Sequence, residues 1–233
     1  MKVAIVQPYI FPYLGYFQLI NAVDAFVLYD DVHFIKKGWI HRNRILNDGK
    51  ELMFSIPLKK ASQNKLINEI ELAIDQKWRK SFLLSIEHSY KKAPFFNIVY
   101  QLIEKVLNSE VEKISDLATL SISLTIDYME IDTKLLLSSS EFEKTRGRER
   151  ANRLIEITKS LGAKTYVNPQ NGKELYSKLE FAKHGVELFF IEPKLESYKQ
   201  GKKPFVSGLS IIDVMMYNSR PFIKEQLKNY QLI

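Results

Sequence analysis

Cysteine is absent from this 233-residue sequence, which excludes disulfide bonds, cysteine nucleophiles and thiolate metal sites. Histidine is scarce, and the four residues at positions 33, 41, 88 and 184 offer no closely spaced pair of ligands, so a structural zinc site is not expected and no metal-binding residues are proposed. No apolar run approaches the ~18 residues of a membrane-spanning helix, and the N-terminus lacks the pattern of a signal peptide. We therefore expect a cytoplasmic protein without membrane insertion.

The residues that are present suit a globular protein with a basic surface. Apolar residues make up 45% of the chain and aromatic residues 12%, which is ample for a packed core. The net charge is +7, and the basic residues cluster in IKKGWIHRNRI, YKKAP, EKTRGRERANR and YKQGKKPF. Because there is no basic tail and no nucleic-acid-binding module, no nucleic acid is expected. The clusters indicate either solvated surface or a site for a phosphorylated small molecule.

Predicted strands and helices alternate along much of the sequence. Apolar runs bounded by polar residues predict buried strands at residues 3–6, 25–29, 133–139, 164–168 and 186–193. Helical periodicity predicts helices at residues 16–23, 148–162, 172–185 and 209–222. This alternation favours an α/β fold with an open, mainly parallel, Rossmann-like sheet.

Two segments interrupt the alternation. Residues 36–60 predict a basic β-hairpin around an Asn-Asp-Gly turn, with a loop longer than two residues. Residues 76–131 predict a layer of three helices, with Pro94 separating the first two and Ser115-Asp116 capping the third. Since no flexible linker stands out, we expect one domain over residues 1–233, with the hairpin and the helical layer as insertions.

Polar residues or prolines follow every predicted strand. They are Gln7-Pro8, Asp30-Asp31, residues 138–140, Asn168-Pro169 and Glu192-Pro193. In a doubly wound sheet the carboxyl ends of parallel strands share one edge, and ligands bind in the crevice there. The stretch QPYIFPYLG after the first strand is predicted to be a stiff loop whose prolines and aromatic residues hold Gln7 and Gly15 in place.

Three residues are candidates for acid or base catalysis. His41 lies in the densest basic and aromatic motif, and histidine titrates near working pH. Asp30 and Asp31 follow the second strand, and because adjacent strand residues point to opposite faces, we expect one of them in the site. The alternatives are a packing histidine and structural carboxylates.

Five residues of the basic clusters are candidates for binding a phosphate or carboxylate group. Arg42 and Arg44 share one face of the predicted hairpin strand, and Asn43 faces the other way. Arg146 and Arg148 precede a helix, where cations are unfavourable unless an anion binds. The alternative for the four arginines is a solvated surface.

The remaining candidate substrate-binding residues lie at the predicted crevice, except for one in the C-terminal motif LSIID. The crevice residues are Gln7, Tyr9, Tyr13, Gly15, Tyr16 and Asn168, and the residue of the C-terminal motif is Asp213. The tyrosines are as well explained by packing of the loop against the sheet, and Asp213 by a structural hydrogen bond. His88, His184, Trp39 and Trp78 are expected to be structural.

The first loop also bears comparison with nucleotidyltransferases, which carry His-x-Gly-His after the first strand of such a sheet. Here Tyr13-Leu14-Gly15-Tyr16 occupies the analogous place. Tyrosine donates one hydrogen bond but supplies no cation at neutral pH. A nucleotidyltransferase-like enzyme using a nucleoside triphosphate therefore stays an alternative.

Three long motifs together resemble the WbqC-like protein family: QPYIFPYLGYFQLI, DAFVLYDDVHFIKKGWIHRNRI and YKQGKKPFVSGLSIIDVMMYN. The segment GAKTYVNPQNGKELY is similar as well. Position 33 is a departure, since many relatives carry glutamine where this chain has His33, which argues against His33 as an indispensable acid or base. The resemblance implies a role in the biosynthesis of O-antigen and other bacterial surface polysaccharides.

In that context the best-fitting activity is decoration of a sugar precursor. The hypothesis is transfer of an acyl or aminoacyl group to the amino group of a nucleotide-linked amino sugar. The expected partners are the nucleotide-linked sugar and a small acyl or aminoacyl donor, with no cofactor specified by the sequence. A noncatalytic binding or scaffolding protein is a further alternative, and homo-oligomeric assembly stays open.

Overall fold

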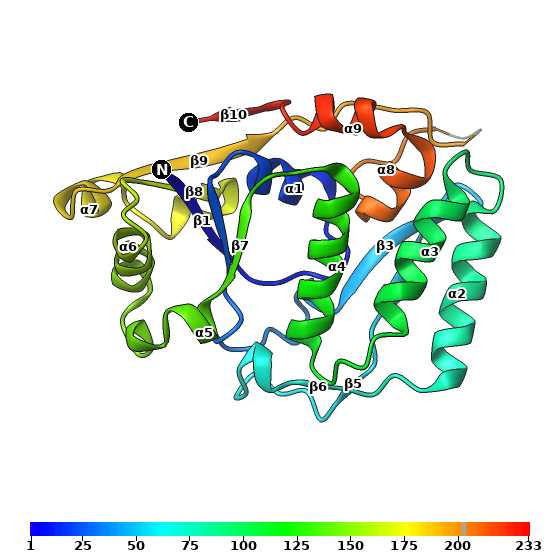
Figure 1. The fold of residues 1–233 in the computed structure, drawn as a ribbon, viewed down its shortest axis with the longest axis horizontal. Helices are drawn as coiled ribbons and strands as arrows, with labels where there is room; N and C mark the ends of the chain where they lie inside the picture. The colour runs from blue at the N-terminus through cyan, green and yellow to red at the C-terminus, as the bar shows by residue number, and fades with distance from the viewer. Residues whose placement is uncertain (202–203) are drawn as a thin grey trace.

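The computed structural model describes residues 1–201 and 204–233, and a six-stranded sheet forms its centre (Figure 1). The strand order is β10-β9-β8-β1-β2-β7, and every neighbouring pair is parallel except β10 with β9. The strands are β1 Lys2–Val6, β2 Ala25–Leu28, β7 Lys134–Leu137, β8 Thr165–Pro169, β9 Glu187–Pro193 and β10 Tyr230–Leu232. The predicted open, mainly parallel α/β sheet is therefore confirmed, and β10 is an addition that the sequence did not predict.

The order of the strands reverses between β1 and β8. From β1 the chain proceeds outward through β2 to β7, and it then returns to the other side of β1 to form β8 and β9. The pairing of β1 with β8 covers Lys2 with Thr165 and Val3 with Tyr166, although β1 continues to Val6. This reversal is the topological switch point at which open α/β sheets bind ligands.

Helices cover both faces of the sheet. On one face lie α6 Arg150–Ser160 and α7 Lys178–Lys183, and on the other lie α1 Leu14–Asn21 and α4 Ile114–Met129 (Figure 1). Side chains of β1 alternate between the two cores: Val3 and Ile5 belong to the first and Ala4 to the second. Burial on both faces explains why the strands are continuous apolar runs rather than alternating ones.

The basic hairpin forms as an antiparallel pair outside the central sheet. Its strands are β3 Arg42–Asn47 and β4 Lys50–Ser55, and residues Asn47 and Lys50 pair across the turn. Asp48 and Gly49 both have positive φ, which is the two-residue type I′ turn that matches the twist of a hairpin. The prediction of a loop longer than two residues is therefore wrong.

The helical layer consists of α2 Gln76–Tyr90, α3 Phe96–Leu107 and α4, and Pro94 separates the first two as predicted. The predicted cap of α4 is wrong, because this helix begins after Lys113, and the Ser115 hydroxyl donates to Asp116 inside the first turn.

The helix predicted at 172–185 is shorter in the structure, where α7 covers Lys178–Lys183. The remaining elements are β5 Leu58–Lys59, η1 Ile67–Glu69, β6 Glu71–Leu72, α5 Ser138–Glu141, η2 Glu143–Thr145, η3 Gln170–Glu174, α8 Ile211–Tyr217 and α9 Arg220–Gln226.

The larger hydrophobic core joins the central sheet, the hairpin and the helical layer. It includes Phe26 of β2, Ile45 of β3, Ile86 of α2 and Ile122 of α4 in one connected cluster. The organisation of residues 1–233 as one domain with insertions at about 36–60 and 76–131 stays a prediction.

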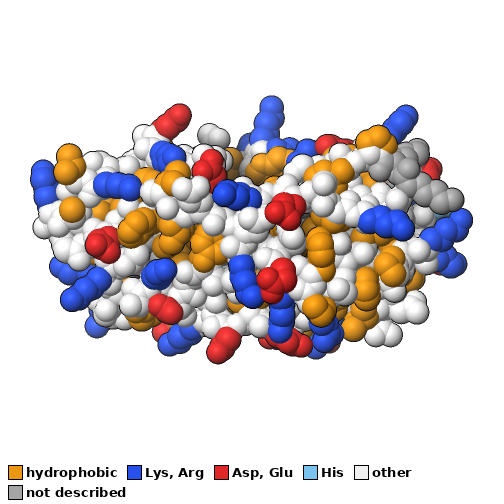
Figure 2. All heavy atoms as spheres, turned by 90° about the horizontal axis from the view of Figure 1, so that it is seen from above, with side chains coloured by type: hydrophobic (Ala, Val, Ile, Leu, Met, Phe, Trp, Pro, Cys, Tyr) orange, Lys and Arg blue, Asp and Glu red, His pale blue; other side chains and the backbone are white. Residues whose placement is uncertain are grey.

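Charges on the surface are mixed. On the side that carries β10 and α9, acidic side chains lie among the scattered Lys and Arg side chains (Figure 2). Two lysines of the YKQGKKPF cluster, Lys202 and Lys203, lie outside the described residues. Within residues 1–201 and 204–233, no helix has both the length and the hydropathy needed to cross a bilayer.

Candidate functional site

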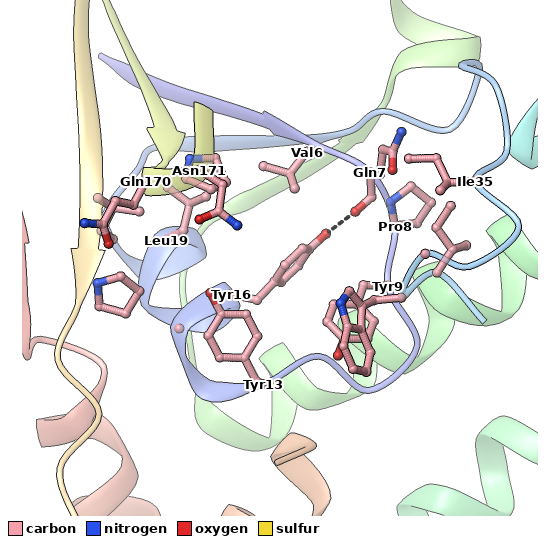
Figure 3. A pocket seen from close by; sticks show the side chains of 17 residues that line it. Val6, Gln7, Pro8, Tyr9, Tyr13, Tyr16, Leu19, Ile35, Gln170 and Asn171 are labelled. Atoms are coloured by element: carbon pink, nitrogen blue, oxygen red, sulfur yellow. Dashed lines mark hydrogen bonds between the residues drawn. The ribbon is translucent and has the colours of Figure 1, made fainter. Parts of the chain in front are cut away.

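A cavity of about 410 Å³ lies at the carboxyl ends of β1, β8 and β9 (Figure 3). Its walls come from the first loop, the start of α1, residues 35–40 and the segment after β8. Five sequence-predicted residues line it: Gln7, Tyr9, Tyr13, Gly15 and Tyr16. Among the described residues, none with a charged side chain lines this cavity. The described lining therefore forms a neutral, mainly apolar pocket with tyrosine and tryptophan rings in its wall, at the switch point of the sheet.

The first loop is held rigidly by its central residue, Phe11. Phe11 is completely buried and has a φ of 42°, which is unusual for a bulky residue. Its N–H donates to the Ser121 hydroxyl at 3.2 Å, and its carbonyl accepts from the Asn43 amide and from the Ser210 hydroxyl. Asn43, proposed as a substrate-binding residue, is thus buried beneath the loop and positions it.

Three tyrosines form the inner wall of the cavity. The Tyr16 hydroxyl donates to the Gln7 carbonyl at 3.0 Å, and the ring of Tyr9 packs edge-on against that of Tyr16 at 6.2 Å. Burial raises the pKa values of Tyr9, Tyr13 and Tyr16 above their ordinary value of 10.0. Their hydroxyls therefore stay protonated at neutral pH and are able to donate hydrogen bonds.

Gly15 is required by the close packing of this wall. A Cβ atom at position 15 would lie 2.4 Å from the Tyr13 ring and 3.0 Å from Cβ of Pro193. Any side chain would have to displace Tyr13 or the end of β9. The glycine of the motif therefore allows α1 to start directly against the cavity.

Arg42 and Arg44 lie beside the cavity, next to Trp39, which lines it. Their guanidinium carbons are 5.4 and 5.5 Å from the centre of the Trp39 ring. Arg42 donates to the carbonyls of Gly38 and Lys37, and Arg44 donates to a carboxylate of the hairpin and to a backbone carbonyl. Trp39, expected to be structural, is 42% exposed and forms part of the pocket. The sequence alone gave no sign of this, because exposure depends on the tertiary packing.

His41 follows the cavity-lining residue Ile40, but it is not itself part of the lining. Its Nδ1 is buried without a hydrogen-bond partner in the described part of the chain, and its ring lies 5.4 Å from Phe34. Burial, together with the charge of Arg42, lowers the pKa of His41 below 6.5. Both effects favour the neutral imidazole, and the catalytic role of His41 stays a prediction.

Asp30 and Asp31 lie at the carboxyl ends of β2 and β7, outside the cavity lining. Asp30 accepts from the backbone N–H of Ser139 at 3.0 Å and from its hydroxyl at 2.6 Å. The Ser138 hydroxyl lies 3.0 Å from a carboxylate oxygen of Asp30 and 2.5 Å from one of Asp31. Both residues follow the end of β2, so strand alternation does not separate them, and both carboxylates join this cluster. The expectation that one of them enters a site stays a prediction.

Two arginines complete this cluster through Asp31. Arg153, which is 4% exposed, lies 2.6 Å from the carboxylate, and Arg146 lies 3.3 Å from it. Burial by itself would raise the pKa of Asp31, but hydrogen bonds from Arg153 and Ser138 outweigh it, and the pKa lies below 3.8. Arg153 was not predicted, because an arginine inside an amphipathic helix gives no sign of burial.

Arg146 and Arg148, candidates for binding a phosphate or carboxylate group, do not line the cavity, and that role stays a prediction. Arg146 pairs with Asp31, and Arg148 lies 3.4 Å from Glu156 on α6. These two arginines therefore serve ion pairs next to the buried cluster.

Asn168 and Asp213 occupy structural positions away from the cavity lining. Asn168 accepts a hydrogen bond from the Tyr166 hydroxyl at 2.9 Å, and its amide fills the space that a Cβ of Gly172 would need. Asp213 is fully buried and accepts from two tyrosine hydroxyls, of Tyr90 and Tyr198, and from the Gln200 amide. The residues after β8 that do line the cavity are Pro169, Gln170 and Asn171.

No group of three or more His, Asp and Glu side chains suited to a metal ion occurs within the described ranges. The cavity instead offers aromatic rings, tyrosine hydroxyls and carboxamides. These groups bind neutral polar molecules and flat rings.

The sheet and its cavity define a Rossmann-like α/β protein with a cavity at the switch point. The chain belongs to the WbqC-like protein family, whose profile matches residues 7–225. It is also similar to "Uncharacterized protein Rv1507c" of Mycobacterium tuberculosis, with 27% identity over 217 residues that cover 92% of each chain.

Proposed function

We propose that this protein binds a nucleotide-linked amino sugar in the cavity and transfers an acyl or aminoacyl group to the sugar amine, as a step in making surface-polysaccharide precursors. The observation that carries the proposal is the neutral cavity at the switch point, with two arginines beside its aromatic wall. Resemblance to the WbqC-like family supports the polysaccharide context.

The lining suits a sugar derivative. Aromatic rings pack against the apolar faces of sugar rings, and carboxamides such as those of Gln170 and Asn171 hydrogen-bond hydroxyl groups. Arg42 and Arg44 supply positive charge close to the wall, which a diphosphate needs. Burial of the sugar amine in an uncharged, mainly apolar cavity would disfavour its ammonium form, which favours the neutral amine that the reaction needs.

The reaction forms a C–N amide bond between the sugar nitrogen and the acyl carbon. The bond from that carbon to the leaving group of an activated acyl or aminoacyl donor breaks, and the nitrogen loses its proton to the leaving group or to water. The protonated hydroxyl of Tyr13 is suited to donate to the oxygen that becomes negative during attack. Because the described residues of the lining include no carboxylate or imidazole, positioning of the two substrates is the proposed main source of acceleration.

The test is incubation of purified protein with UDP-linked, dTDP-linked and GDP-linked amino sugars and with acyl and aminoacyl thioesters. Mass spectrometry should detect a product heavier by one acyl group and sensitive to amide hydrolysis. The absence of acylated product with every pair overturns the proposal, as does a nucleotidyl product formed from a nucleoside triphosphate and a sugar phosphate.

The variant His41→Asn separates two mechanisms of the same transfer. A base acting directly contributes roughly 10²–10⁴-fold to the rate. Since His41 does not line the cavity, we expect turnover of His41→Asn to fall by less than about tenfold. That loss is smaller than the roughly 10²-fold minimum for a residue that acts directly as the base. A loss of a hundredfold or more, measured across pH, would restore His41 as the base.

A further inference from the structure

The cavity has two chemically different ends. Figure 3 shows Tyr9 and Ile35 at one end and Gln170 and Asn171 at the other, with the ring of Tyr16 between them. The first end is built by the loop after β1 and by residues 35–40, and the second by the segment after β8. An elongated ligand would therefore meet different side chains at its two extremities.

The end at Tyr9 is aromatic and lies beside positive charge. The rings of Tyr9 and Trp39 are 6.2 Å apart and tilted by 41°, and Trp39 keeps 42% of its surface exposed. Arg42 and Arg44 lie within 5.5 Å of the Trp39 ring centre. An exposed ring with adjacent guanidinium groups matches a flat base joined to phosphates, because bases stack on aromatic rings and arginine binds phosphate.

The opposite end is polar but uncharged. The side chain of Asn171 makes no hydrogen bond within the described part of the chain, whereas that of Gln170 donates to Glu192 at 3.3 Å. A free carboxamide offers both a donor and an acceptor, which together match a sugar hydroxyl, whereas it lacks the positive charge that favours a diphosphate. The two ends thus differ in the group that each can recognise.

We infer that the nucleotide sugar lies in the cavity in one direction, with its base stacked on Trp39, its diphosphate next to Arg42, and its sugar against Asn171. Trp39 is then the residue that recognises the nucleotide, and Asn171 the residue that senses the sugar. This assignment rests on the proposed function and adds to it the orientation of the substrate.

The experiment uses nucleotides with and without the sugar. The chain contains two tryptophans, so Trp78→Phe leaves Trp39 as the only one, and its fluorescence reports ligand at that end. UDP, dTDP and GDP, each with and without an attached amino sugar, are titrated into this variant. Calorimetry then compares Trp39→Leu, Trp39→Phe and Asn171→Leu with Leu179→Ala, a control at a 78% exposed residue of α7.

We expect the best-binding nucleotide to quench Trp39 with or without its sugar. Trp39→Leu should weaken both ligands by the same factor, roughly 5–150-fold for a lost stacking contact, and Trp39→Phe should restore part of the affinity. Asn171→Leu should weaken only the sugar-bearing ligand, by roughly 2–10-fold. Leu179→Ala should change neither affinity.

Two results overturn the orientation: equal affinities in Trp39→Leu and the unaltered protein, or a loss in Asn171→Leu that also affects the nucleotide without sugar. If acyl transfer occurs while either result holds, the proposed function stands and the orientation fails. If the expected binding pattern appears without any transfer, the orientation stands and the proposed reaction fails.

Discussion

Two regions at the same edge of the sheet use their polar residues in opposite ways. At the ends of β2 and β7, the carboxylates of Asp30 and Asp31 are buried and bonded by serines and by Arg153. At the ends of β1, β8 and β9, the cavity lining is uncharged, and the Tyr13 hydroxyl has no partner among the described residues. The two carboxylates are thus paired within the fold, whereas the described lining of the other region surrounds an open cavity.

Removing the charge of Asp31 should have the largest effect on the free energy of unfolding. In Asp31→Asn the guanidinium of Arg153 stays buried without its carboxylate, so we expect the free energy of unfolding to fall by about 3–5 kcal/mol. Urea denaturation measures this change. The matched control is Glu51→Gln, which removes the partially exposed pair with Arg44 and should cost at most about 1 kcal/mol. Equal effects of the two substitutions would show that the cluster is not a stabilising one.

Adding one methyl group to the cavity wall should have the next largest effect. Gly15→Ala places a Cβ against the ring of Tyr13, and overpacking of this kind costs roughly 1–3 kcal/mol. Nucleotide-sugar binding should fall as the ring moves into the cavity. In a Tyr13→Ala background much of the cost should disappear. If Gly15→Ala destabilised the Tyr13→Ala variant as much as it destabilises the unaltered protein, the steric explanation would be contradicted.

Acidification should weaken the buried cluster by a smaller amount. Because the pKa of Asp31 is lowered in the folded protein, its stabilising contribution is complete above the ordinary value of 3.8 and is lost as the pH falls through the lower folded pKa. Unfolding measured from about pH 6 down to about pH 3 should therefore show a smaller loss in Asp31→Asn than in the unaltered protein.

The opposite sign is expected at Asp213. Burial raises the pKa of this carboxyl, so its contribution to stability is favourable at low pH and is lost as the pH rises through the folded pKa. Asp213→Asn should therefore make the loss of stability on acidification steeper. Identical pH profiles for the two aspartate variants would refute both assignments.

The smallest effect on stability is expected at the cavity itself. Tyr13→Phe removes a hydroxyl that has no partner in the described ranges, so the free energy of unfolding should change by less than about 0.5 kcal/mol. If this hydroxyl donates to the reacting oxygen, turnover should nevertheless fall by roughly 10²-fold. Loss of stability without loss of turnover would assign Tyr13 to the fold instead of the site.

The sequence predicted the parallel strands because each is a short apolar run followed by polar or chain-breaking residues. It also predicted that the first loop is rigid and lies at the carboxyl edge of the sheet, and six residues from 7 to 16 do line the cavity there. It did not predict β10, because three residues, Tyr230–Leu232, pair only by tertiary contact with β9.

Local sequence therefore determined where strands and helices form, since hydrophobic periodicity and turn residues act over a few positions. Only the tertiary structure decided which polar residues are used for stability. Asp31 and Arg153 are 122 positions apart, and nothing in their local sequence shows that they meet as a buried pair. The same holds for Trp39, whose exposure at the cavity depends on how the hairpin segment packs beside the first loop, because burial and partner choice result from contacts between distant segments.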